Sequence, residues 1–135
     1  MRKLIADIFQ DVAAAPTLDD KINVLRTHNT VALRQVLMAA LTPSVEFEVE
    51  IPSYRENEET DGYAANSLYV EQKRLYVFLK RSKVSPLRRK QLLAQILESI
   101  DRSDALVLIK VLHKDLSEYE ITVDLVNKAF PGLIK

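Results

Sequence analysis

The chain has 135 residues, of which 47% are hydrophobic, and this length is enough for one domain that buries most of its apolar surface without disulfides. Nineteen Lys and Arg balance nineteen Asp and Glu, so net charge alone favours neither a nucleic acid nor a membrane as partner. The absence of cysteine excludes disulfides and thiolate sites, and two glycines are too few for a glycine-rich phosphate loop.

The first forty residues show helical spacing three times. Apolar residues recur every three or four positions from residue 4 to residue 12 and again from residue 33 to residue 41, where Pro43 ends the pattern. Between them, Thr17 followed by Asp20 is typical of a capping box at a helix start. These patterns predict three short helices.

Residues 45–51 change to a period of two. Val, Phe, Val and Ile alternate with three glutamates, which predicts a short extended segment lying over the helices. Residues 52–66 follow as an acidic stretch rich in turn-forming residues, and we expect a loop there.

The second half of the chain predicts four more helices. Two cover residues 67–81 and 85–100, and the second of these begins at Ser85-Pro86, a good N-cap and first helical position. The other two cover residues 102–116 and 122–130. No apolar run is long enough to cross a membrane and the N-terminus carries acids where a signal peptide is apolar, so we expect a cytoplasmic protein.

Apolar spacing also predicts the core of the last two helices. Leu106, Ile109 and Leu112 would face inward, and Phe130 and Leu133 would pack the C-terminal segment onto the domain. The alternative for that segment is an exposed hook for a partner. Together the patterns predict an all-α fold, a compact bundle of about seven helices in a single domain spanning residues 1–135, with one extended segment near residues 45–51.

Charge is unevenly distributed along the chain. Seven acids and one base lie between residues 46 and 61, whereas residues 73–90 hold eight bases and no acid, with aromatic residues between them. Such a run predicts a phosphate-binding surface, because each neutralised phosphate releases a counterion. The alternative is that the bases occupy the solvated faces of two helices with the acidic loop folded over them. The candidate DNA-binding residues are Lys73, Arg74, Lys80, Arg81, Lys83, Arg88, Arg89 and Lys90.

Candidate catalytic and metal-binding groups do not assemble into a site. His28 and His113 lack the spacing of a metal-binding pair, and a helix end explains His28. Ser85 and Ser103 are placed as helix caps, and Glu58–Glu59 lies in the predicted loop rather than in an apolar pocket. We therefore expect a non-enzyme with no catalytic residues, no metal and no cofactor.

The C-terminal segment VLIKVLHKDLSEYEITVDLVNKAFPGLIK contains a basic residue with Asp-Leu, a turn, then Asn-Lys, an aromatic residue and Pro-Gly-Leu-Ile. It resembles the end of the N-terminal, all-helical DNA-binding domain of T-even-type phage ATP-dependent DNA ligases, and the first half is similar in element order and length. The resemblance implies a domain that lies along the minor groove of duplex DNA, and it adds Lys114 and Lys128 to the candidate contacts. The Pro-Gly-Leu-Ile ending also resembles that of small stand-alone proteins of tailed phages, which implies a location in the host cytoplasm.

Two departures limit what the resemblance implies. The Lys-x-Asp-Gly adenylation motif of the ligases is absent, and the turn at residues 117–120 carries two glutamates and no glycine, so it would repel a phosphate. The better candidate surface is therefore the basic run. We expect an accessory protein that binds duplex DNA non-specifically in replication, repair or packaging. The alternative is an adaptor that has lost DNA binding and docks a phage or host protein.

Overall fold

The computed structural model describes residues 3–57 and 66–135. Within them the chain is all-helical, as predicted, with seven α-helices, two 3₁₀-helices and no strand longer than an isolated bridge. In chain order the elements are α1 (Ile5–Ala14), α2 (Leu18–Thr27), α3 (Val31–Leu41), α4 (Leu68–Glu71), η1 (Gln72–Phe78), α5 (Pro86–Ser99), α6 (Arg102–Leu112), η2 (Ser117–Tyr119) and α7 (Val123–Ala129). None of the described helices has the length and apolar character needed to cross a bilayer.

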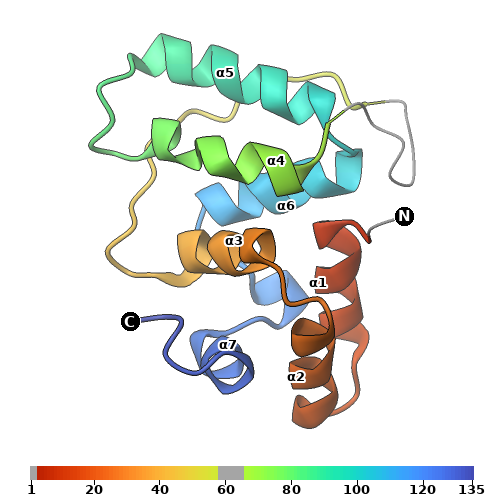
Figure 1. The fold of residues 1–135 in the computed structure, drawn as a ribbon. Coiled ribbons are helices and arrows are strands. Elements are labelled where there is room, and N and C mark those ends of the chain that lie inside the picture. Colours follow the sequence, from red (N-terminus) through yellow and green to blue (C-terminus); the bar gives the residue numbers. More distant parts are fainter. Residues whose placement is uncertain (1–2, 58–65) are drawn as a thin grey trace.

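The helices form one bundle around α6, as Figure 1 shows. α6 packs against α1, α3 and α5, and α2 packs against both α1 and α7. In the view of Figure 1, α4 and α5 lie at one end of the molecule, and α2 and α7 at the other. The chain therefore holds residues 73–90 at the end of the bundle opposite to its C-terminal helix.

Helix starts follow the local chemistry of the sequence. Thr17, Ser85 and Thr122 each accept a hydrogen bond from the backbone N–H three residues later, at 3.1, 3.2 and 3.1 Å. Each such cap contributes about 1 kcal/mol. The predicted cap at Ser103 is wrong: Asp101 caps α6, and Ser103 donates its backbone N–H and its hydroxyl to Asp101 Oδ1, at 3.0 and 2.7 Å.

The core of α6 differs from the prediction. Leu106, expected to face inward, is 52% exposed, whereas Val107, Leu108 and Val111 are buried. A helix that packs on several neighbours buries a broad face, and that face is centred about one residue further along than the stripe through Leu106. Leu112 is buried as expected.

The extended segment is confirmed. Its apolar residues are partly buried and its glutamates exposed, and Phe47 forms an isolated antiparallel bridge with Leu79. Glu48 N–H donates to the carbonyl of Phe78 at 2.8 Å, and Lys80 N–H to that of Glu46 at 2.9 Å. This pairing also corrects the helix predicted for residues 67–81, which becomes 3₁₀ after one turn and ends at Phe78, because Leu79 must be extended to pair.

The C-terminal segment is packed onto the bundle. Asn127 holds both backbone groups of Ile134: its Oδ1 accepts from Ile134 N–H at 2.8 Å and its Nδ2 donates to the Ile134 carbonyl at 3.1 Å. Gly132, at φ 77°, makes the turn between them. Ile134 is 6% exposed, while Phe130 and Leu133 are only partly buried against the core. The prediction that the segment is packed is confirmed, but its most buried anchor is Ile134 rather than Phe130.

Candidate functional site

We call residues 73–90 the basic joint: it comprises most of η1, the connecting loop and the first turn of α5. Five of its eight bases are exposed and make no hydrogen bond or ion pair through their side chains with other residues of the described part of the chain. These five are Lys73, Lys80, Arg81, Lys83 and Arg88. Their charges are available to a ligand.

The loop of the basic joint is fixed by a buried arginine. Arg89 is 6% exposed, and its guanidinium donates to the carbonyls of Ser82, Val84 and Glu48 at 2.6, 2.9 and 2.7 Å. Arg89 was predicted as a candidate DNA contact, but its guanidinium is buried and fully engaged within the fold, so it is not available to a phosphate. These carbonyls point inward where no helix or sheet can satisfy them, and the planar fork of Arg supplies the missing donors. Arg89 positions the loop and leaves the exposed cations to face solvent.

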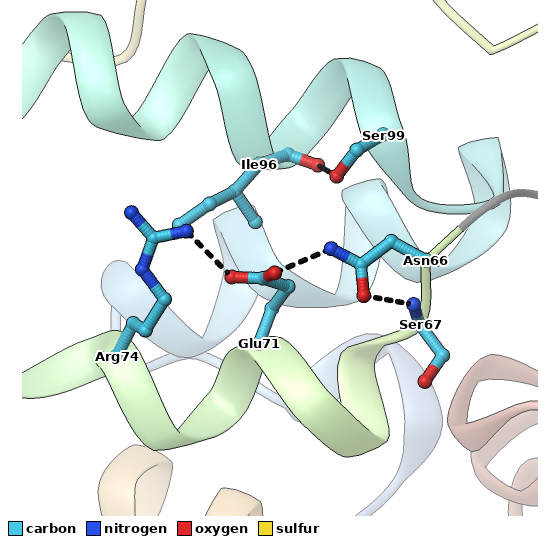
Figure 2. A network of polar contacts seen from close by, with 6 residues as sticks. All are labelled: Asn66, Ser67, Glu71, Arg74, Ile96 and Ser99. Carbon is cyan, nitrogen blue, oxygen red and sulfur yellow. Dashed lines mark hydrogen bonds and ion pairs between the residues drawn. The ribbon is translucent and has the colours of Figure 1, made fainter.

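Arg74 has a partner inside the fold, as Figure 2 shows. Its Nη1 lies 3.1 Å from Oε2 of the buried Glu71, whose Oε1 accepts from the side-chain amide of Asn66. Asn66 also accepts from Ser67 N–H at 2.9 Å and donates its own N–H to the carbonyl of Ser99 at 3.3 Å. The network joins the start of α4 to the end of α5, and Arg74 supplies the charge that the buried carboxylate needs.

The eighth base of the joint, Lys90, lies 3.2 Å from Glu50. Both side chains are exposed, so this pair contributes little to stability and can rearrange. Glu46 and Glu48 are exposed on the same extended segment, which the Phe47 bridge holds beside the joint. An acidic segment thus borders the basic joint, while Glu58–Glu59 and Asp61 of the predicted acidic loop lie outside the described residues.

Lys114 and Lys128 have structural partners elsewhere. Lys114 Nζ donates to the carbonyls of Ala39 and Thr42 at 3.1 and 2.5 Å, and so satisfies the C-terminal end of α3. Burial lowers the pKa of Lys114. Lys128 pairs with Asp124 one turn earlier on α7, at 3.1 Å, at the far end of the bundle from the joint (Figure 1). The fold does not bring Lys128 together with the other candidates.

The turn that departs from the ligase pattern has its charges compensated. Glu118 lies 2.6 Å from Lys110 Nζ, and Glu120 lies 3.7 Å from Lys21 Nζ. Glu120 has φ 58°, a left-handed conformation that glycine adopts more readily. A glycine at residue 120 would adopt this conformation without the steric cost of a Cβ.

Two features of the fold were not predicted. One is a groove of about 700 Å³ between the extended segment and the start of α5, with apolar walls from Phe47, Val49, Leu87 and Leu112. Leu87 on its rim is exposed. Because the two walls are far apart in sequence, no local pattern could have indicated the groove.

The other is the fully buried Asp104 of α6. Its Oδ1 accepts from Ala6 N–H at 2.9 Å, and its Oδ2 has no hydrogen bond within the described structure. It serves as the cap of α1, whose own N-cap residue is Leu4 and supplies no side-chain acceptor. Burial raises the pKa of Asp104 to about 6, and Asp101 and Asp7 add to the rise, while the Ala6 and Leu68 backbone N–H groups oppose it.

The histidines occupy helix ends: His28 is the C-cap residue of α2 and His113 that of α6. The position expected for His28 is confirmed. In the described ranges, no three His, Asp or Glu side chains come together in a way that could hold a metal ion.

Comparison with known proteins places the chain in a family. No curated protein matches the sequence. Residues 8–118 match a family described as a family of unknown function (DUF6433). This match runs from within α1 to within η2 and includes the whole basic joint, the groove and Asp104. The chain therefore belongs to the DUF6433 family.

Proposed function

We propose that the protein binds duplex DNA non-specifically through the basic joint. The observation that carries the proposal is the set of five exposed cations that have no partner in the described structure, in a stretch from Lys73 to Arg88 that contains no acid. Lys and Arg that contact phosphates hold a protein on a duplex without reading its bases. Binding is then indifferent to sequence and weakens as salt rises.

Contacts from outside the basic joint support this role because they hold its loop in one conformation. Arg89 and the Phe47 bridge fix the loop that carries Lys80, Arg81 and Lys83. A fixed loop loses less conformational entropy on binding than a free one. We propose that the protein is a non-enzymatic accessory of replication, repair or packaging. The resemblance of the C-terminal segment to the ligase DNA-binding domain favours a phage-type protein of the host cytoplasm.

The alternative function, an adaptor that docks another protein, is favoured by the groove. Its apolar walls and the exposed Leu87 are suited to a hydrophobic side chain of a partner. This use would leave the cations of the joint without a role. If the protein binds DNA through the basic joint, charge reversal there should weaken binding. If it binds a partner through the groove, charge reversal of the exposed cations should leave that binding unchanged.

Charge reversal in the basic joint tests the proposal. Arg88→Glu places an acid in the first turn of α5, where the helix dipole favours it, so the fold should be retained. The matched control is Arg102→Glu, because Arg102 is exposed at the start of α6, beyond the far end of the 14-residue α5, about 20 Å away.

Fluorescence anisotropy with a labelled duplex at low salt reads out binding. We expect the affinity of Arg88→Glu to fall at least tenfold and that of Arg102→Glu to change little. Equal losses in the two variants would show a diffuse charge effect rather than a site at the joint. If the unmodified protein does not bind, the adaptor function takes the place of DNA binding.

A further inference from the structure

An aromatic ring is exposed in the middle of the basic joint. Tyr76 is 67% exposed, and among the described residues it has no aromatic ring partner and its hydroxyl makes no hydrogen bond. Its neighbours Leu75 and Phe78 are buried, and they fix η1 so that Tyr76 points to solvent. Burying Tyr76 would require turning η1 and exposing Phe78.

The ring lies in line with a cation. In a 3₁₀-helix, residues three positions apart are eclipsed, so Lys73 and Tyr76 share one edge of η1. Val70, three residues before Lys73, is also exposed, at 56%. Lys80 follows Tyr76 after the helix ends, so cations stand on both sides of the ring in the chain.

Phosphate contacts alone make no use of this ring. An aromatic side chain flanked by cations is the arrangement with which proteins hold a nucleic-acid strand whose bases are unpaired: the ring stacks on a base while the cations neutralise the phosphates on either side. In an uninterrupted duplex each base is already stacked and paired, so the ring has nothing to stack on.

We infer that Tyr76 stacks on an unpaired base, and that the basic joint binds DNA containing a single-stranded segment next to duplex more tightly than an uninterrupted duplex. This inference rests on the proposed DNA binding and narrows its substrate to DNA with exposed bases, such as a gap or an overhang. Charge complementarity carries the choice of nucleic acid over protein, because the ring lies in a stretch of the chain that holds five exposed cations without partners among the described residues and no acid.

The test compares three labelled DNAs of equal phosphate number: a blunt duplex, a duplex with a short single-stranded overhang, and a single strand. Stacking of one base on an aromatic ring predicts that the overhang binds about fivefold or more tightly than the blunt duplex. Tyr76→Ala should abolish this preference and leave blunt-duplex affinity within about twofold, because the phosphate contacts remain. Tyr76→Phe keeps the ring and should keep the preference.

The control is Leu106→Ala, since Leu106 is also a large exposed apolar residue but lies on α6, outside the joint. It should bind all three DNAs as the unmodified protein does. Equal affinity for blunt and overhanging DNA, or a preference that survives Tyr76→Ala, would overturn the inference while leaving the proposed duplex binding intact. Absence of binding to all three DNAs would instead overturn the proposed function, and with it this inference.

Discussion

The buried carboxyl of Asp104 predicts that the protein becomes less stable as pH rises from acid to neutral. The ordinary pKa of 3.8 is raised to about 6 in the folded protein. The folded state therefore holds its proton more tightly than the unfolded state, and stability is greatest below the unfolded pKa and is lost as pH rises through the folded pKa. At about 1.4 kcal/mol per pKa unit, ionised Asp104 lowers the free energy of unfolding by about 3 kcal/mol.

Asp104→Asn isolates this effect, because the amide has nearly the same shape and does not titrate. Its side-chain oxygen can still accept from Ala6 N–H. The free energy of unfolding is measured by urea denaturation from about pH 5 to about pH 7.5. Over that range the unmodified protein should lose roughly 1–2 kcal/mol relative to Asp104→Asn.

Asp19→Asn is the control, since Asp19 is an exposed acid of α2. Its pH profile should parallel that of the unmodified protein. Parallel profiles for the unmodified protein and Asp104→Asn would refute the reasoning, because they would mean that Asp104 titrates alike in the folded and unfolded states.

Three further predictions follow from single contacts. Arg89→Ala should lower the free energy of unfolding by about 3 kcal/mol or more in urea denaturation, because three carbonyls lose their donor, whereas Arg88→Ala should change it by less than about 0.5 kcal/mol. Ile134→Ala should cost about 2–4 kcal/mol and Phe130→Ala should cost less than Ile134→Ala, because Phe130 is only partly buried; equal or reversed losses would contradict the packing of the C-terminal segment. Glu46→Gln should strengthen duplex binding about twofold in the anisotropy assay, since it removes a carboxylate beside the joint, and an unchanged affinity would place the DNA elsewhere.

The sequence predicted what short-range chemistry determines. The caps at Thr17 and Ser85 depend on a side chain and a backbone N–H three residues away, and both are present. The extended segment was predictable because its period of two is visible in seven residues. Even its exposed glutamates and partly buried apolar residues follow that pattern.

Long-range contacts account for the features of the structure that the sequence did not predict. Arg89 is indistinguishable from Arg88 in sequence, and its buried role depends on two carbonyls of the folded loop and on the carbonyl of Glu48, 41 residues earlier. Asp104 meets the N–H of Ala6 across 98 residues, so nothing beside it in the chain indicates a buried carboxyl. The basic joint itself was predictable as a charged run, whereas the division of its bases into structural and exposed ones depends on the folded loop.

The salt dependence of duplex binding tests the central claim most directly. If the five exposed cations each neutralise one phosphate, log K should fall with log salt with a slope of about −4.5, and Arg88→Ala should reduce that slope by about 0.9. The slope should be the same for duplexes of different sequence. A slope near zero, or one that Arg88→Ala leaves unchanged, would contradict DNA binding through the basic joint.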